Sequence, residues 1–474
     1  MQELTRRSLL AGLAVGIGMP AVAKVKAPVV APATPEALVA AAGLSGEVAF
    51  ALADLGTGEI LAQQGMDRPM PPASTAKTIT SLYALDHLGR GYRFQTRLLA
   101  TGPVTGGRIA GDLVLAGGGD PTLSTDDLGD LAAALAQAGV KGIGGRFLVW
   151  SGALPYLPSI DPAQPVWMGY DPAVSGLNLN FNRVNFTWER AGTAWRVGFD
   201  ARAERFAPAV GVAQIEVVAR QTPLFTYSAA PDCERWTVAD AALGRDGSRW
   251  LPVRRPELYA GDVFRTLAAA QGISLPLPEV AQALPEGQVL ASHASAPLPL
   301  VLREMMKYST NMTAEAAGMT ASGARGIAGH DASARAMTGW LGDRIGGLGG
   351  GFVDHSGLGA ASRISPAEMV RALVRLGPGG GLGELMKEVR LPKPAEGQAL
   401  PRRVVAKTGT LNFVTGLVGY LTTAAGAERA FAIYAADLPR HDAVSEDQME
   451  RPPGLSAWLG RARRLQLQLL QGWA

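Results

Sequence analysis

A change in the pattern of apolar residues part-way along the chain places the strongest limit on its fold. Residues 47–54 and 59–63 are predicted to form a hairpin, and apolar residues spaced by three and four predict a helix over 74–88. Between residues 92 and 285, short apolar runs alternate with clusters of Gly, Pro and Asn. Because such runs bounded by turn residues are typical of strands, we expect a β-rich insert there, interrupted by helices at 128–138 and 259–271.

Helical patterns return after this insert. We expect helices at 298–308, 313–322, 332–344 and 366–376, then strands at 403–406, 416–422 and 431–435. The final predicted helix, 455–473, carries leucines on one side and arginines on the other. Such a helix could make peripheral contact with a membrane, but packing of its leucines against a sheet is favoured.

Composition narrows the class of protein. The chain has 474 residues, 47% of them hydrophobic, which is enough for two or three domains and excludes a disordered chain. A mean hydropathy of +0.11, without long apolar runs, excludes a polytopic membrane protein. The charges nearly balance, with 44 basic and 41 acidic residues, so nucleic acid is not expected as a partner. The single cysteine, Cys233, excludes an internal disulfide and is expected to be buried.

The N-terminus predicts export. Residues 1–23 have the form of a signal peptide, with Arg6 and Arg7 ahead of an apolar stretch and a small-residue cleavage pattern at 21–23. The paired arginines leave two export routes open, the general secretory route and the twin-arginine route. On either route, we expect a mature protein that is periplasmic and begins near Lys24.

Three short motifs supply the residues for a nucleophilic site. Ser74 and Lys77 are spaced to share one face of a helix, and a lysine buried beside Lys407 would have a lowered pKa and could take the serine proton. Ser309 could pass that proton to a leaving amine, and Asn311 could hold the peptide group of a substrate. The expected catalytic residues are therefore Ser74, Lys77, Ser309 and Asn311.

The third motif is expected to bind substrate. Lys407, Thr408 and Thr410 offer a cationic, hydrogen-bonding seat for a carboxylate, and Gly409 allows a strand to approach the ligand closely. Backbone N–H groups of Ser74 and Thr410 would form an oxyanion hole. Each motif alone has an ordinary structural explanation, such as a helix cap, a turn or a strand end. Their occurrence together and in this order is what favours an active site.

Other site chemistries fit the sequence less well. The five histidines are far apart in the sequence and there is no cluster of cysteines, so we expect no metal and no cofactor. Asp354, His355 and Ser356 are adjacent, which is unusual for a catalytic triad, and no nucleophile elbow is present. The sequence also has no glycine–lysine pair of the kind found in phosphate-binding loops.

The motifs lie in longer segments that resemble the D-alanyl-D-alanine carboxypeptidase/endopeptidase family, the class C low-molecular-mass penicillin-binding proteins. The segments are PPASTAK at 71–77, GDLVLAGGGDPTL at 111–123, MKYSTNMTAE at 306–315, DHSGL at 354–358 and VAKTGT at 405–410. The resemblance implies an α/β (α+β) fold with a serine β-lactamase/transpeptidase-like domain, an antiparallel sheet flanked by helices. It also implies that this domain is split into 24–95 and 287–474 around an insert, 96–286, of one or two domains.

The resemblance further implies the reaction. Ser74 would attack the D-Ala–D-Ala carbonyl of a peptidoglycan peptide, release D-alanine and form an acyl-enzyme that water hydrolyses. The same site would cut D-Ala–diaminopimelate cross-links, and β-lactam antibiotics would acylate it. Two alternatives remain. One is a β-lactamase or esterase with the same residues, distinguished by rapid turnover of the penicillin acyl-enzyme, and the other is a non-catalytic cell-wall scaffold.

Two positions depart from the family pattern. His355 stands where the family usually has glycine, so we expect an altered rim of the active site. Trp150 aligns with a family aspartate that can bind the free amine of the substrate, unless Trp150 is simply part of the insert core. If the alignment holds, amine recognition would be weakened or would fall to another acid, and Asp161 and Asp171 are the candidates.

Overall fold

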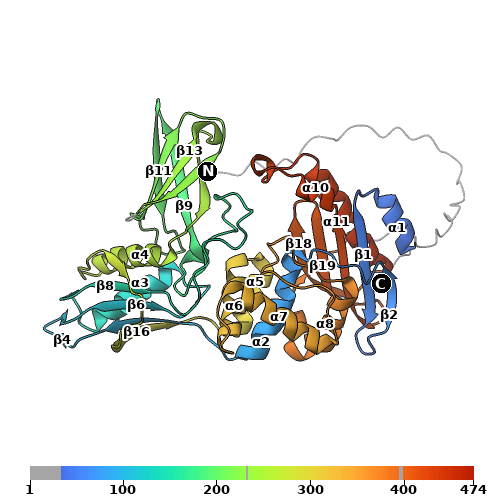
Figure 1. The fold of residues 1–474 in the computed structure, drawn as a ribbon, viewed down its shortest axis with the longest axis horizontal. Coiled ribbons are helices and arrows are strands. Elements are labelled where there is room, and N and C mark those ends of the chain that lie inside the picture. Colours follow the sequence, from blue (N-terminus) through green and yellow to red (C-terminus); the bar gives the residue numbers. More distant parts are fainter. Residues whose placement is uncertain (1–33, 231–232, 394–398) are drawn as a thin grey trace, which may run out of the picture.

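We describe a computed structural model of the chain, which covers residues 34–230, 233–393 and 399–474. The predicted signal segment, 1–23, lies outside these residues. Figure 1 shows two bodies side by side, one built from both ends of the chain and the other from its middle. The strands nearest the N-terminus lie against those nearest the C-terminus, so the first body is discontinuous in sequence.

The first body is organised by an antiparallel sheet. In the described residues this sheet has six strands, in the order β17 (Lys387–Glu388), β18 (Arg403–Leu411), β19 (Val414–Thr422), β20 (Glu428–Ala436), β1 (Glu47–Asp54) and β2 (Ile60–Gln64). The join between the two ends of the chain is the pairing of β1 with β20, which runs from Glu47 opposite Ala436 to Asp54 opposite Arg429.

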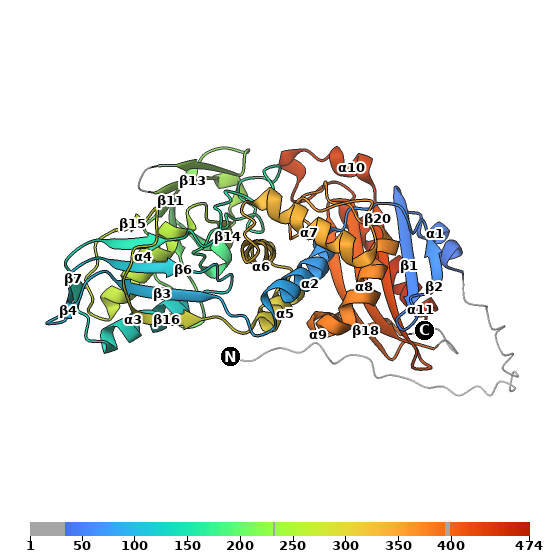
Figure 2. The same cartoon turned by 60° about the horizontal axis from the view of Figure 1, so that its bottom comes forward.

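Alternation along β1 explains why helices cover both faces of this sheet. Ala49, Ala51 and Ala53 face one core, whereas Phe50 and Leu52 face the other. The first face is covered by α2 (Ala76–Leu88), α5 (Leu298–Tyr308), α6 (Asn311–Gly323), α7 (His330–Ile345), α8 (Pro366–Gly380) and α9 (Leu382–Leu385). Figure 2 shows these helices grouped on one side of the sheet.

The other face is covered by α1 (Pro35–Ala42) and α11 (Leu455–Gly472). Leu465, Leu469 and Leu470 of α11 are buried against the sheet. The predicted packing of the leucine side on a sheet is therefore confirmed. The short α10 (Leu438–Asp442) and η4 (Glu446–Gln448) connect the last strand to α11.

The second body is built around a mixed sheet. Within the described residues its five strands run in the order β15 (Pro278–Val280), β8 (Phe147–Trp150), β6 (Leu113–Gly117), β3 (Gln95–Ala100) and β16 (Gln288–Ala294), and α3 (Thr125–Gln137) and α4 (Pro256–Ala270) pack on it. Two three-stranded sheets extend the same core: β10 (Ala194–Asp200), β9 (Arg183–Ala191) and β14 (Asp246–Pro252), and β11 (Ala213–Val218), β13 (Glu234–Ala239) and β12 (Phe225–Ala229). A small sheet joins β4 (Val104–Thr105), β5 (Arg108–Ile109) and β7 (Gly142–Ile143).

The limits of the insert follow from strand pairing. We propose that the insert covers 96–286 as expected, but with its end moved to Ala294. The reason is that β16 pairs with β3 from Gln288 to Ala294, so the chain returns to the first body only after Ala294. One hydrophobic core spans α3, α4 and side chains of the three-stranded sheets such as Phe186 and Trp236. Cys233 is buried, as predicted.

Candidate active site

Ser74 lies in a tight turn at the start of α2. The turn is the 3-10 helix η1 (Ala73–Thr75), in which the hydroxyl of Thr75 donates to the carbonyl of Pro72 at 2.7 Å. Ala73 has a positive φ of 47°, a left-handed conformation that is uncommon for a residue other than glycine. The predicted helix therefore begins two residues after Ser74, and the serine is held at its N-terminus.

Lys77 lies one turn further along and is completely buried. Its Nζ donates to Ser74 Oγ at 2.9 Å, to Asn311 Oδ1 at 2.7 Å and to the carbonyl of Ser356 at 2.7 Å. Burial, followed by the nearby charge of Lys407, lowers the pKa of Lys77 well below its usual range. The structure thus places a lysine that loses its proton readily next to the predicted nucleophile.

Lys407 and Ser309 form a second pair. Lys407 Nζ donates to Ser309 Oγ at 2.9 Å and to the carbonyl of Thr408 at 2.7 Å. Burial, and then the charge of Lys387, lowers the pKa of Lys407 to about 7. Ser309 ends α5 in a left-handed conformation, with φ of 59°, so the chain turns there and starts α6 at Asn311.

The strand β18 passes very close to Ser74. A Cβ added to Gly409 would lie 2.7 Å from the carbonyl oxygen of Pro72 and 3.1 Å from the backbone nitrogen of Ser74. The position therefore requires glycine, as the sequence suggested. Thr410 borders the cavity next to Ser74, whereas Thr408 is exposed, and the part of both threonines in binding a carboxylate stays a prediction.

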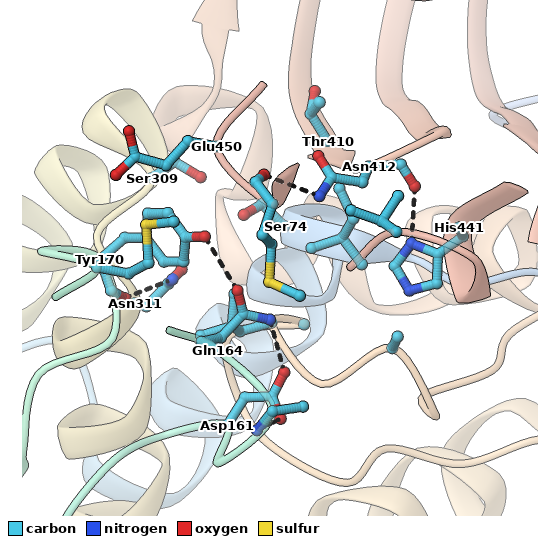
Figure 3. Close-up of a pocket in the computed structure, with 18 of the residues that line it drawn as sticks. Ser74, Asp161, Gln164, Tyr170, Ser309, Asn311, Thr410, Asn412, His441 and Glu450 are labelled. Atoms are coloured by element: carbon cyan, nitrogen blue, oxygen red, sulfur yellow. Dashed lines mark hydrogen bonds between the residues drawn. The ribbon is translucent and has the colours of Figure 1, made fainter. Parts of the chain in front are cut away.

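A cavity of about 600 Å³ opens onto these residues. Ser74, Ser309, Asn311 and Thr410 line it from the first body, and Figure 3 shows that side chains of the insert face them. The insert contributes a wall that includes Asp161, Gln164, Tyr170 and Arg249, and the segment after α10 contributes Glu450. Sequence reasoning named only Asp161 from this wall, because no short motif marks the others.

The insert contacts the site directly through Asn311. Asn311 Nδ2 donates to the carbonyl of Tyr170 at 2.9 Å. The hydroxyl of Tyr170 donates to Gln164, which in turn donates to Asp161 at 2.8 Å (Figure 3). Arg254, which is 7% exposed, fixes this loop by donating to the carbonyls of Pro158, Val166 and Asp171.

The two acids considered for amine recognition have different surroundings. Asp161 borders the cavity. Asp171 is buried, and its carboxylate accepts from the backbone N–H groups of Ile160 and Asp161, while burial raises its pKa to about 7. Trp150 packs against Leu148 and its neighbours on the insert sheet. Of the two acids, Asp161 is the one placed to meet a substrate.

The expectation for His355 is wrong. Its side chain is completely buried, and Nε2 lies 2.7 Å from the hydroxyl of Ser333, so it does not alter the rim of the cavity. A Cβ on Gly318 would lie 2.2 Å from the imidazole ring, which shows that a glycine on α6 provides the space. The histidine is therefore accommodated in the interior and does not line the cavity.

Glu315 is a structural part of the site to which sequence reasoning gave no role. Its buried carboxylate accepts from the backbone N–H groups of His355 and Ser356 and lies 2.9 Å from His330 Nε2. Burial alone would raise the pKa of Glu315, but the hydrogen bond from His330 and the neighbouring groups lower it to about 2. Glu315 therefore holds the turn whose Ser356 carbonyl accepts from Lys77.

A serine beside a buried lysine, at the start of a helix packed on an antiparallel sheet, is characteristic of serine hydrolases with the β-lactamase/transpeptidase-like fold. Residues 36–454 match the D-Ala-D-Ala carboxypeptidase 3 (S13) family, and the chain belongs to this family. It is thus an enzyme of the D-Ala-D-Ala carboxypeptidase class. The family, the activity and the fold class expected from the sequence are all confirmed.

Individual relatives agree with this assignment. The chain is 28% identical over 424 residues to a D-alanyl-D-alanine carboxypeptidase of Actinomadura sp. (strain R39), covering 80% of this chain and 76% of that protein. It is 25% identical to a D-alanyl-D-alanine carboxypeptidase of Haemophilus influenzae, covering 81% and 84% of the two chains. The crystal structure of penicillin binding protein 4 from Haemophilus influenzae has the same fold, with a TM-score of 0.74 at 21% identity, over 92% of this chain and 99% of that one. Within the described ranges, no helix is both long and apolar enough to cross a membrane.

Proposed function

We propose that the protein is an exported DD-peptidase that uses Ser74 as its nucleophile and acts on peptidoglycan peptides in the periplasm. The observation that carries this proposal is the 2.9 Å contact between Nζ of the fully buried Lys77 and Oγ of Ser74, which lines the cavity. A neutral lysine at this distance can accept the serine proton, which is what a serine needs to attack a peptide carbonyl. The N-terminal signal pattern supports export.

The proposed reaction has two steps. Ser74 Oγ bonds to the carbonyl carbon of the penultimate D-alanine while its proton passes to Lys77. The carbon–nitrogen bond then breaks, Ser309 delivers a proton to the departing amine of D-alanine, and the proton held by Lys77 replaces the one that Ser309 gave. Water attacks the resulting ester, returns the proton to Ser74 and frees the shortened peptide. The contact between Ser309 and Lys407 supports this proton path, because it keeps the hydroxyl next to a group with a pKa of about 7.

Substrate binding is proposed to use three groups. Lys407 and Thr410 supply charge and a hydroxyl for the terminal carboxylate of the substrate, with Thr408 beside them. The amide of Asn311 holds a peptide carbonyl of the substrate, which takes the place of the Tyr170 carbonyl now bonded to it. Backbone N–H groups of Ser74 and Thr410 stabilise the oxyanion, a role supported by the close approach of Gly409 to the Ser74 nitrogen.

We further propose that β-lactams acylate Ser74 and that the enzyme cuts D-Ala–diaminopimelate cross-links. A structure of the Haemophilus influenzae penicillin binding protein 4 is a complex with a β-lactam, and its fold matches this chain with a TM-score of 0.72. The wide cavity, with one wall from the insert, supports access by a branched substrate. A β-lactamase or esterase and a non-catalytic scaffold are the competing outcomes.

The test is release of D-alanine from a peptide that ends in D-Ala–D-Ala. We expect release by the wild type and by Ser456→Ala, a control at an exposed serine on α11, and no release by Ser74→Ala. Cleavage of a purified cross-linked dimer tests the endopeptidase activity in the same preparation. Rapid hydrolysis of penicillin without release of D-alanine would indicate a β-lactamase instead, and no activity on either compound would favour the scaffold.

A further inference from the structure

A second cavity of about 670 Å³ lies on the insert beside the catalytic one. The two cavities share the strand β14: Arg249 lines the catalytic cavity and the next residue, Trp250, lines the second. Gly169, also part of the catalytic wall, is so close to this strand that an added Cβ would lie 2.8 Å from the Trp250 carbonyl oxygen. Because successive side chains of a strand point to opposite faces, the second cavity lies across β14 from the catalytic one, and only a polymer longer than a short peptide could reach both.

Arg183 is the distinctive residue of this cavity. Its guanidinium carbon lies 5.4 Å from the centre of the Phe181 ring and 5.8 Å from that of Trp250, so two aromatic rings flank the cation. Its Nε is buried without a hydrogen-bond partner, and no ion pair to Arg183 is found among the described residues. A buried N–H group without a partner is unusual, because buried polar groups are normally hydrogen-bonded.

The other charged groups of the cavity are mostly paired. Arg205 binds Asp130 at 2.7 Å, Arg202 binds Asp200 at 3.1 Å, and Asp127 accepts from Ser124 at the start of α3. Asp126 accepts from the backbone N–H groups of residues 204–206. The remaining acid, Glu204, is exposed to solvent. Arg183 is thus the lining cation that lacks an anionic partner in the described part of the chain.

The backbone around the cavity is strained. Asn180, Phe181 and Asn182 have φ values of 49°, 57° and 51°, three consecutive left-handed residues that are not glycine. Asn180 is fixed through hydrogen bonds to Thr125 and Asn182 through one to the Ala173 carbonyl. Phe181 also packs against a hydrophobic cluster that includes Met312, Ala316 and Met319 of α6. The strained turn therefore places an aromatic ring between α6 and the unpaired arginine.

We propose that Phe181, Arg183 and Trp250 form a second substrate subsite that binds a free carboxylate of the peptidoglycan polymer outside the catalytic cavity. This inference rests on the proposed function. Arginine binds carboxylates through paired hydrogen bonds, and the exposed face of Trp250, 37% exposed, can carry the apolar side of the bound segment. A short peptide that fills only the catalytic cavity does not reach this subsite, whereas a wall polymer carries further stem-peptide carboxylates that do.

The test compares binding to polymer with cleavage of a short peptide. The binding probe is purified peptidoglycan sacculi, and the protein carries Ser74→Ala so that it does not consume them. We expect Arg183→Gln to weaken co-sedimentation about tenfold, Trp250→Leu to weaken it several-fold, and Arg202→Gln, a control from the same cavity, to leave it unchanged. On the Ser74 background, Arg183→Gln should release D-alanine from the short peptide at the wild-type rate.

Two results would overturn the proposal. Unchanged binding of both variants to sacculi would show that the subsite does not exist. If Arg183→Gln lost as much activity on the short peptide as it lost binding to sacculi, Arg183 would only support the fold. If Arg183→Gln does not fold, the binding of Trp250→Leu to sacculi tests the proposal in its place. Failure of the proposed function would be seen in a different measurement. In that case the wild type would release no D-alanine, while the variants would still differ in binding to sacculi.

Discussion

The two bodies of this protein contribute to the active site in different ways. The first body supplies the proposed nucleophile and the groups proposed to carry its proton, and each comes from a short motif at the end of a helix or on one strand. The insert supplies a wall through a loop between Pro158 and Asp171, and this loop is fixed by the distant Arg254. Local sequence patterns therefore identify the candidate catalytic residues, whereas the wall of the cavity around them depends on contacts between residues far apart in the sequence.

Removing the base should give the largest effect in the first body. We expect Lys77→Met to reduce the rate of penicillin acylation by roughly a thousandfold or more, because a neighbouring base is what activates a serine hydroxyl. Stopped-flow or quenched mass measurements would follow the reaction. Lys307→Met, at an exposed lysine of α5, should react like the wild type. Acylation of Lys77→Met at near the normal rate would mean that another group takes the Ser74 proton.

Much of the first body could be predicted from its sequence. The spacing of Ser74 and Lys77 fixes their contact within one helix turn, and the buried strands are apolar enough to be found directly. The contact between Ser309 and Lys407 joins residues far apart in the sequence, so only the fold reveals it. The role of Glu315 was missed because its partners are backbone N–H groups of residues 355–356, which no side-chain pattern reveals.

Glu315 gives the next largest effect, on stability against acid. Its folded pKa of about 2 lies below the ordinary value of 4.5, so the charged carboxylate stabilises the fold above pH 4.5. This contribution, about 3 kcal/mol, is lost as the pH falls from 4.5 through 2. Denaturant unfolding should therefore show Glu315→Gln to be less stable than the wild type at pH 7, with the difference shrinking towards pH 2. A difference that is constant across this range would contradict the low pKa.

Loosening the insert wall should give a smaller effect that depends on substrate. Arg254→Gln removes hydrogen bonds to three carbonyls of the loop, so we expect kcat/KM for a D-Ala–D-Ala peptide to fall about tenfold, mainly through KM. Arg254→Lys should recover part of the loss. Acylation by a small β-lactam should change less, and an equal loss with both compounds would mean that the wall is not a substrate-binding element.

Trp150 and Asp161 offer the smallest and most local comparison. Trp150 packs on the insert sheet, so Trp150→Phe should cost about 1 kcal/mol of stability and leave peptidase activity unchanged. Asp161 borders the cavity, so Asp161→Asn should lower kcat/KM several-fold for a peptide with a free side-chain amine and leave an acetylated peptide unaffected. Parallel assays on the two peptides check both. If Trp150→Phe instead lost activity only on the peptide with a free amine, Trp150 rather than Asp161 would be the residue that recognises this amine.

Sequence could not rank these two positions because the answer depends on the fold of the insert. Trp150 lies on β8, but the loop that reaches the cavity starts several residues later, and its approach depends on Arg254 and Asp171. His355 shows the same limit. Its position in the DHSGL segment suggested an altered rim of the active site, but Gly318 on another helix allows it to be buried.

The most direct test of the central claim is the intact mass of the mature protein after brief exposure to penicillin. If Ser74, activated by Lys77, is the nucleophile of a DD-peptidase, the wild type should gain the mass of one penicillin and keep it for minutes, and Ser74→Ala should gain nothing. An adduct of equal size on Ser74→Ala would place the nucleophile elsewhere. An unmodified wild type would also contradict the account, and analysis of the solution would then show whether penicillin had been hydrolysed, as by a β-lactamase, or left intact.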